Sequence, residues 1–440
     1  METFWIKALQ LIMALSLLVV IHELGHFMWA RVFKIRVEKF YIFFNPWFSL
    51  FKWKPKKSDT TYGIGWVPLG GYVKIAGMID ESMDKEQMAQ PPQPWEFRTK
   101  PAWQRLLVMT GGVLNNFILA IIIYAGIAWY WGEKTIPYQN AYEGMDFTPA
   151  AQSLGFRNGD ILLTADGRLI DSRERSALFK MLESERVEVL RNHRDTVTLV
   201  MPDNALTSMP ENDPFMAYRV PVFVKQVMPG EPAAKAGLRE GDRIIAVGDS
   251  LTPAYTELAP ALMAYGGKTV PMTLLRGTDT INVPATPTAN GKLGFGLMGP
   301  LEVFRCDTTQ YGLLQSIPIG VNNGTEMLTT YVSSLKHVFT KEGAESIGGF
   351  GAIGNLFPPA WDWRTFWEMT AFLSIILAFM NIIPIPALDG GHVMFLLWEV
   401  VTRRKPSEKF LEYAQMTGMA LLFALLLYAN ANDIYRFFIK

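Results

Sequence analysis

Four apolar stretches dominate the hydrophobic pattern of the chain. A helix needs on the order of 20 residues to cross the roughly 30 Å hydrocarbon core of a bilayer, and each stretch is long enough. Aromatic residues gather where these stretches end, at 129–131 and 361–367, which is typical of membrane interfaces. We therefore predict four transmembrane helices, at residues 4–30, 104–131, 366–387 and 415–438.

The first span could also be a cleaved secretion signal. Its basic start is weak because Glu2 cancels Lys7, and no small-residue cleavage site follows it. His22 and Glu23 also lie inside it. We interpret it as a retained span.

The first loop combines aromatic strand formers with glycines, in FFNPWFSLFKWKP at 43–55 and YGIGWVPLGGYVKIAGM at 62–78. This pattern predicts short β-hairpins that lie at the membrane or dip into it. An ordinary hairpin domain in the cytoplasm is the alternative. The polar, proline-rich residues 80–101 predict a linker.

A repeat organises the segment between the second and third spans. PAAQSLGFRNGDILLTADG at 149–167 recurs as PAAKAGLREGDRIIAVGD at 232–249. Each copy predicts a short helix, a Gly-Asp turn and a strand. The pattern resembles the PDZ domain in its bacterial, HtrA-like permutation, which implies PDZ domains at 133–215 and 216–300. Such a fold exposes a strand edge to which a peptide can add; two small β domains acting as spacers are the alternative.

The segment after the repeats is amphipathic. Its apolar face is formed by Leu328, Tyr331, Val332, Leu335, Val338 and Phe339, and its polar face by Thr329, Ser333, Lys336 and His337. About 13 residues are too few to span a bilayer. We therefore predict a helix along the outer membrane interface, followed by glycine-rich residues 345–359. Packing against a PDZ domain is the alternative.

Composition and charge narrow the class of protein. Of 440 residues, 50% are hydrophobic and 19% charged, with 41 basic against 41 acidic residues, which excludes a disordered chain, a small disulfide scaffold and a nucleic-acid binder. The zero balance hides two regions: 31–105 holds 13 Lys and Arg against 7 Asp and Glu, whereas 133–367 holds 21 against 26. Because short basic loops stay in the cytoplasm, we expect both termini and the repeats on the outer side.

The first span contains HELGH at 22–26. On a helix, His22 and His26 lie one turn apart on the same face and can reach one metal ion, with Glu23 beside them to accept a proton from water. Ionisable residues inside a membrane span are costly unless they serve a function or find partners, and a satisfied structural cluster is the alternative. The single Cys306 excludes a cysteine-based metal site.

Two histidines leave a tetrahedral zinc short of a third protein ligand. Asp389, in NIIPIPALDGGHVMF at 381–395, is one candidate and His392 is its rival. Pro384 and Pro386 should break the third span just before Asp389 and expose backbone groups to a substrate. His193 and His337 are expected at the surface.

Five motifs in one order resemble the site-2 protease family, specifically its bacterial sigma-E-regulating group with tandem PDZ domains. They are HELGH, VPLGGYVK, GGVLNNF, the PDZ repeat and NIIPIPALDGG. The resemblance covers essentially the whole chain. Two departures are FFNP at 43–46, where a GFG-like element is expected, and Val113, where proline is usual.

The resemblance implies a role for each motif residue. Zn²⁺ would be bound by His22, His26 and Asp389, and Glu23 would be the general base. Substrate binding is implied for Asn381, Pro384, Pro386, Asn116, Gly70, Gly71 and Tyr72.

The resemblance also implies an activity: a zinc intramembrane endopeptidase of the bacterial inner membrane, acting in a stress response. Its substrates would be single-span membrane proteins such as anti-sigma factors already cut by a site-1 protease, and signal-peptide remnants. The PDZ pair would exclude substrates with bulky outer domains. A catalytically inactive membrane-anchored PDZ scaffold and a metal transporter are the alternatives.

The expected fold is a polytopic α-helical membrane protein with membrane-associated β-hairpins and two periplasmic PDZ domains. The expected segments are 1–31 (first span, with HExxH), 32–103 (cytoplasmic-side hairpins and linker), 104–131 (second span), 133–215 and 216–300 (PDZ domains), 308–360 (amphipathic and glycine-rich), 366–392 (third span, with the LDG motif), 393–414 (cytoplasmic loop) and 415–438 (fourth span).

Overall fold

The chain folds into two units. The helical unit combines Met1–Gly132 with Gln310–Lys440, and the β unit spans Glu133–Thr309. The computed structural model describes residues 2–68, 70–78, 90–174, 177–202, 205, 215–338 and 348–438. Parts of three predicted segments lie outside these described residues: 80–89 of the linker, 206–214 of the first repeat domain, and 339–347 of the amphipathic and glycine-rich segment.

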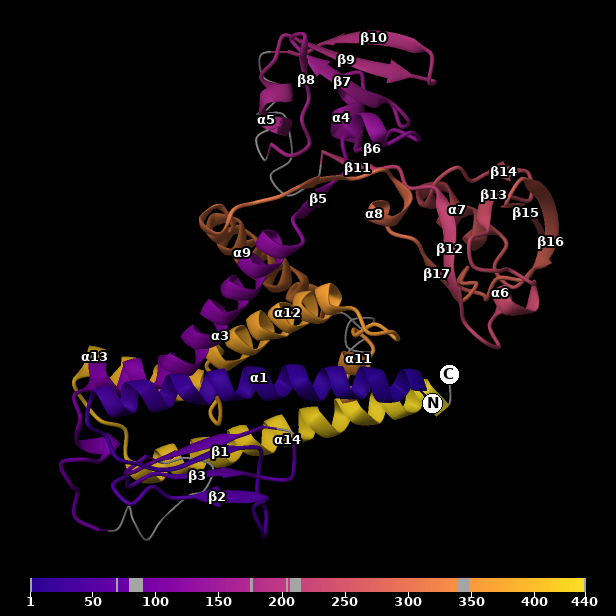
Figure 1. Cartoon of the computed structure of the whole chain (residues 1–440). Coiled ribbons are helices and arrows are strands. Elements are labelled where there is room, and N and C mark those ends of the chain that lie inside the picture. Colours follow the sequence, from indigo (N-terminus) through magenta and orange to yellow (C-terminus); the bar gives the residue numbers. More distant parts are fainter. Residues whose placement is uncertain are drawn as a thin grey trace. The chain divides into compact units, whose positions relative to one another are not determined.

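Helices α1, α3, α12 and α14 are each long and apolar enough to cross a membrane, which confirms the four predicted spans. Helix α3 is central, since it packs against α1, α9, α12 and α13 (Figure 1). The helices of this unit are α1 (Glu2–Val32), α3 (Ala102–Tyr130), α9 (Leu313–Val338), α11 (Phe350–Gly354), α12 (Trp363–Ile382), α13 (Asp389–Thr402) and α14 (Glu408–Phe438).

Small residues bring α1 and α3 into direct backbone contact. A Cβ on Gly25 would overlap the carbonyl of Gly111, and a Cβ on Gly111 would lie 2.8 Å from the carbonyl oxygen of Gly25. In membrane helices such glycines permit the close approach that dispersion forces and interhelical hydrogen bonds require. The turn of α1 that carries HELGH is therefore held tightly against α3.

The third span breaks at the predicted prolines. Helix α12 ends at Ile382 and Ile383 is extended. Helix α13 then begins at Asp389 and continues to Thr402, so the segment 393–414, predicted as a loop, holds a helix over its first ten residues. The apolar residues after Gly390 and Gly391 could belong to a new helix or to the end of the third span. The sequence pattern alone does not distinguish these two possibilities.

The first loop forms a four-stranded sheet, whereas its pattern predicted short β-hairpins at 43–55 and 62–78. The strands are β1 (Val37–Ile42), β2 (Phe51–Trp53), β3 (Thr61–Ile64) and β4 (Tyr72–Ile75). Their order is β2-β3-β1-β4, with β1 parallel to β3 and antiparallel to β4. The sheet contacts α1 through β1 and β4. Strand β4 is thus an edge strand of this sheet.

Helix α9 is longer than predicted. It runs for 26 residues and packs on α3 and α12. A Cβ on Gly320 would come within 2.6 Å of the carbonyl oxygen of Ile121, and the ring of Tyr331 contacts Phe379, with centroids 5.7 Å apart. Pro318 and neighbouring polar residues interrupt its apolar pattern, which is why the sequence predicted only the second half.

The β unit contains two sheet-based subdomains. The first has the sheet β10-β9-β7-β8 and the pair β11-β6, and the second has β16-β15-β13-β12-β17 with β14 paired to β13. Strand β18 (Asp307–Thr309) pairs with β5 (Glu133–Thr135) where the chain enters and leaves the unit.

The elements of the first subdomain are η2 (Tyr138–Asn140), β6 (Met145–Phe147), α4 (Pro149–Ser153), β7 (Ile161–Ala165), β8 (Arg168–Leu169), α5 (Ala177–Leu182), β9 (Arg186–Arg191), β10 (Asp195–Val200) and β11 (Met216–Tyr218). Those of the second are β12 (Val222–Val227), α6 (Pro232–Lys235), β13 (Arg243–Val247), β14 (Ser250–Leu251), α7 (Tyr255–Ala264), β15 (Val270–Arg276), β16 (Asp279–Ala285), β17 (Phe295–Leu297) and, after it, α8 (Pro300–Val303). Because β11 pairs with β6, residues 216–218 belong to the first subdomain and not, as predicted, to the second.

The Gly-Asp turn of each repeat is held by the same interaction. Arg191 binds both carboxylate oxygens of Asp160, and Arg276 binds both of Asp242; the Nη2–Oδ2 distance is 2.7 Å in each pair. Both aspartates are buried. The hydrogen bonds from Arg276 hold the pKa of Asp242 below its usual range. The sequence repeat is therefore also a structural repeat.

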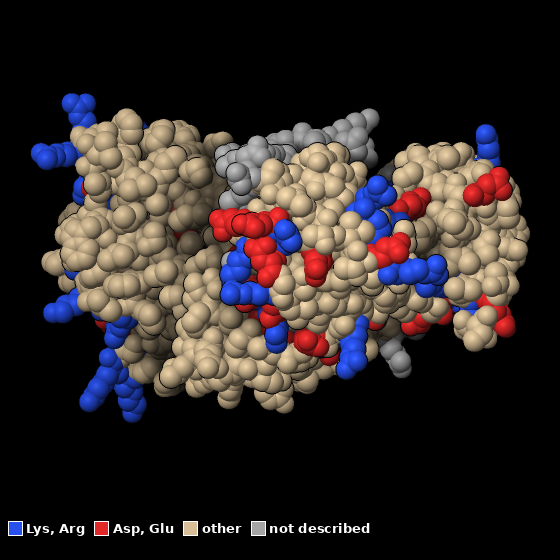
Figure 2. All heavy atoms as spheres, turned by 90° about the horizontal axis from the view of Figure 1, so that it is seen from above, with Lys and Arg blue, Asp and Glu red and all other residues tan. Residues whose placement is uncertain are grey.

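Charge is distributed unevenly over the surface. Figure 2 shows Lys and Arg side chains projecting from one margin of the molecule, next to a broad face without charge. In the helical unit, exposed basic residues occur after β2, at Lys56 and Lys57, and at the end of α13, at Arg403 and Arg404. The described structure thus agrees with basic loops flanking apolar helices.

Candidate metal centre and active site

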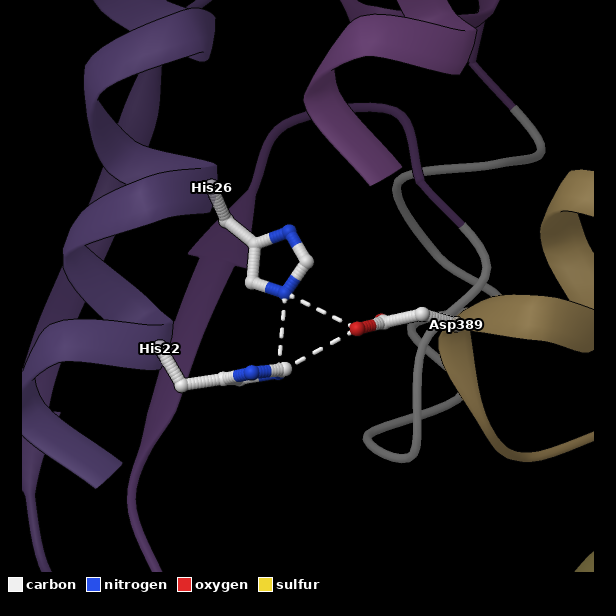
Figure 3. Close-up of side chains that lie close together, drawn as sticks. All are labelled: His22, His26 and Asp389. Atoms are coloured by element: carbon white, nitrogen blue, oxygen red, sulfur yellow. Dashed lines mark hydrogen bonds and ion pairs between the residues drawn. The ribbon is translucent and has the colours of Figure 1, made fainter. Parts of the chain in front are cut away.

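His22 and His26 point from one face of α1 toward the same point. Their Nε2 atoms are 3.2 Å apart, and both residues are buried. The spacing of four residues in the sequence produces this arrangement, because one helical turn separates the two side chains. Figure 3 shows both rings directed at a third side chain from another helix.

That third side chain is Asp389, the first residue of α13. Its Oδ2 lies 3.2 Å from Nε2 of His22 and 3.2 Å from Nε2 of His26. These three residues form the metal-compatible group found among the described residues. His22 and Asp389 lie near opposite ends of the sequence, and the break after α12 brings them together.

The donor set fits zinc. Ligands at about 2.0–2.1 Å from a tetrahedral ion lie about 3.3 Å from one another, and the three distances here are each 3.2 Å. Oδ2 of Asp389 is buried and has no hydrogen-bond partner in the described part of the chain. Two imidazoles and one carboxylate leave a fourth position open, as catalytic zinc sites do.

Glu23 lies beside this group in a cavity of about 540 Å³. A backbone hydrogen bond from Val73 of β4 reaches its carboxylate. The cavity lies inside the helical unit, between α1, the sheet, the end of α12 and the start of α13. Its lining includes Val19, His22, Glu23, His26, Gly70, Gly71, Tyr72, Val73, Met109, Asn381, Leu388, Asp389 and His392.

Only some of the residues predicted to bind substrate line this cavity. Gly70, Gly71 and Tyr72 line it, as does Asn381. Pro384 and Pro386 are outside the lining set; they end α12 and shape the turn that presents Asp389. Of the residues predicted to bind substrate, those before and in β4 and Asn381 therefore line the cavity, and the two prolines do not.

Asn116 contacts a histidine. It is fully buried, it is outside the lining set of the cavity, and its amide lies 3.2 Å from Nδ1 of His22. The backbone carbonyl of Val108 lies 2.8 Å from Nδ1 of His26. Sequence reasoning missed Val108, because a backbone contact leaves no residue-type signal.

The fourth span supports the loop before Asp389. Ala387 has a φ of 82°, which is strained for a residue other than glycine, and its N–H donates to Oε1 of Gln415 at 3.1 Å. A Cβ on Gly418 would overlap the carbonyl of Pro386. Sequence reasoning missed both α14 residues, although a buried glutamine within an apolar span was an available signal.

Two of the other histidines have described side chains, and neither belongs to the group of three donors. His392 lines the cavity but does not belong to the group formed by His22, His26 and Asp389. His193 is exposed in the turn between β9 and β10, as predicted. The side chain of His337 lies outside the described part of the chain.

Known proteins resemble the chain along almost its entire length. The model of Peptidase family M50 matches residues 10–425. Regulator of sigma E protease from Haemophilus influenzae is 28% identical, with 97% of this chain and 98% of that protein covered. Metalloprotease MmpA from Caulobacter vibrioides is 27% identical, with 99% and 96% covered. A Rickettsia conorii protein that carries zinc metalloprotease in its name is 28% identical, with 97% and 98% covered.

The segment matched by the family model contains His22, His26 and Asp389. It also overlaps each of the four apolar helices. The family assignment and the geometry thus agree on a metal-dependent peptidase in a multi-pass membrane protein. The chain belongs to peptidase family M50, the site-2 proteases, and is a zinc metalloprotease.

Proposed function

We propose that the chain hydrolyses a peptide bond within or near a transmembrane helix of its substrate, with Zn²⁺ bound by His22, His26 and Asp389. The observation that carries this proposal is the convergence of these three donor atoms beside Glu23, in a cavity between membrane-length helices. Ionisable side chains in such a position are costly, and catalysis accounts for their presence.

Bound zinc would supply Lewis acidity, which makes water a stronger acid and polarises a carbonyl group. Glu23 is placed to act as the general base. Its carboxylate would take the proton from the attacking water and pass it to the nitrogen of the leaving amine. The hydrogen bond from Val73 fixes this carboxylate relative to strand β4.

The substrate must unwind before it is cut, because a helix hides its amides in internal hydrogen bonds. As an edge strand, β4 can replace those bonds by adding an extended substrate strand to the sheet. Gly70, Gly71 and Tyr72 lie at the start of β4, and Asn381 lines the same cavity. Pro384 and Pro386 would act by leaving backbone groups of the loop free for the substrate.

We further propose that the two subdomains of the β unit are PDZ domains that limit the size of the substrate. The matched Asp–Arg pairs, Asp160 with Arg191 and Asp242 with Arg276, support two copies of one fold. The substrates would be single-span membrane proteins such as trimmed anti-sigma factors, and signal-peptide remnants. The name of the Haemophilus influenzae relative supports the first class.

A scaffold and a metal transporter fit the structure less well. A scaffold has no need for buried metal donors. A transporter needs a series of such groups along its path, and within the described residues His22, His26 and Asp389 are the one group of three. Both alternatives predict no cleavage of any substrate.

A pair of reporters tests the proposal. Each has one transmembrane span, and they differ only in carrying a trimmed or a bulky folded domain on the outer side. With the purified full-length protein we expect cleavage of the trimmed reporter and much slower cleavage of the bulky one. Equal rates for the two would contradict the size limit, and no cleavage of either would contradict the proposed activity.

We propose that both termini and the β unit lie on the periplasmic side of the bacterial inner membrane, with the metal centre toward the cytoplasm. The two termini lie at one end of the helical unit (Figure 1), as an even number of spans requires. The basic residues after β2 and α13 favour the cytoplasm for the opposite end.

Single exposed cysteines test this orientation in a Cys306→Ser background. Asp249 and Lys56 are exposed residues of the β unit and of the β2–β3 connection. In intact spheroplasts, an impermeant maleimide should label the Asp249→Cys protein and spare the Lys56→Cys protein until lysis. The reverse pattern would show an inverted topology.

A further inference from the structure

Helix α3 supplies the groups that contact the two histidines on the side away from Asp389. Nδ1 of His26 lies 2.8 Å from the carbonyl oxygen of Val108, and both groups are buried. A carbonyl oxygen can only accept, so Nδ1 of His26 must carry the hydrogen. In a neutral imidazole Nε2 then keeps its lone pair, and Nε2 is the atom that faces Asp389.

The same requirement applies to His22, whose Nε2 also faces Asp389. Its Nδ1 lies 3.2 Å from Nδ2 of Asn116. Oδ1 of the same amide is buried and has no hydrogen-bond partner among the described residues. Rotating the Asn116 amide by 180° therefore exchanges Oδ1 and Nδ2 without breaking another hydrogen bond. The contact with Nδ1 of His22 then decides which of the two atoms faces the ring.

Spacing along α3 makes both contacts possible. Val108, Gly112 and Asn116 are four residues apart and lie on one helical face. Gly112 sits between the two contacts, where a Cβ would lie 2.5 Å from Nε2 of His26 and 2.8 Å from Nε2 of His22. The absence of a side chain at Gly112 leaves room for the Val108 carbonyl and the Asn116 amide to contact the two rings.

The same turn of α3 also holds the span that leads to Asp389. Ser374 of α12 donates its hydroxyl to the backbone oxygen of Asn116 at 2.7 Å, and both residues are fully buried. Asn116 thus connects the helix of the two histidines with the helix that precedes the aspartate.

We propose that Asn116 is a positioning residue of the metal centre: its amide oxygen accepts from Nδ1–H of His22 and fixes the tautomer in which Nε2 binds the metal. Val108 does the same for His26 through its backbone. This inference rests on the proposed zinc site. It also gives Asn116 an indirect effect on the substrate, through the metal, because the residue is buried outside the cavity.

Zinc affinity of four full-length proteins tests the inference: wild type, Asn116→Leu, Asn116→Asp and the control Asn115→Leu. Asn115 donates to the backbone oxygen of Ile21 and, among the described residues, forms no hydrogen bond with either histidine. Loss of an outer-shell partner weakens metal binding about 10- to 100-fold, so we expect that loss for Asn116→Leu alone. Asn116→Asp keeps an acceptor for Nδ1–H and should bind zinc as tightly as wild type.

Chelator competition gives the affinities, and the absorption bands of Co²⁺-loaded protein report ligand geometry independently of activity. Wild-type affinity in Asn116→Leu would overturn the inference. So would weak binding by Asn116→Asp, since it would show that the amide donates; this variant keeps the test decisive if the leucine variant does not fold. A His22→Ala protein that loses zinc while Asn116→Leu retains it would contradict the inference and leave the proposed zinc site standing.

Discussion

Replacing Glu23 by glutamine is expected to slow cleavage of a single-span reporter about 100- to 10,000-fold, the range that a general base contributes. Glutamine has nearly the same shape and can still accept the backbone hydrogen bond from Val73. It cannot take a proton from water at neutral pH. The metal donors on either side, His22 and His26, are unchanged, so the variant should bind zinc as wild type does.

Two measurements on the same purified protein separate these effects. Reporter cleavage gives the rate, and mass spectrometry of the metal content gives zinc per chain. Equal cleavage by wild type and Glu23→Gln would show that Glu23 is not the base. A slow variant that had also lost its zinc would instead assign Glu23 a role in binding the metal.

Replacing Asp389 by alanine should have the largest effect on the metal itself. Oδ2 of Asp389 lies 3.2 Å from both Nε2 atoms, and its removal leaves only two protein ligands. Since loss of an outer-shell partner already costs about 10- to 100-fold in affinity, loss of this ligand should cost more than that. We therefore expect zinc-free protein after purification and no cleavage.

The matched control is His392→Ala, three residues along α13. His392 lines the same cavity but lies outside the group of converging donors. We expect this variant to keep its zinc. Zinc retained in Asp389→Ala and lost in His392→Ala would identify His392 as the third ligand.

Periodic apolar patterns and short motifs were enough to predict much of this structure. The four spans follow from the length of apolar runs, and β structure within 43–55 and 62–78 follows from aromatic residues between glycines. Strand β1 precedes these segments and was not predicted. The spacing of His22 and His26 placed both rings on one face. Asp389 followed from the family resemblance and from the proline break before it, and the structure brings it to the two histidines.

The elements that sequence reasoning missed depend on tertiary contacts. Helix α13 and the first half of α9 have patterns that are compatible with a loop or a helix, and packing decides between them. The backbone of Val108 carries no side-chain signal, and the role of Asn116 depends on which atom of His22 it meets. Gln415 supports the loop before Asp389 from a helix distant in sequence.

The most direct measurement is the mass of the fragments that the purified protein releases from a trimmed single-span reporter, recorded before zinc is removed, after removal by a chelator, and after zinc is returned. We expect new fragment ends inside the transmembrane segment, their disappearance in zinc-free protein, and their return with zinc. Cleavage that persists without zinc, or fragment ends that fall only outside the span, would contradict a zinc-dependent intramembrane protease.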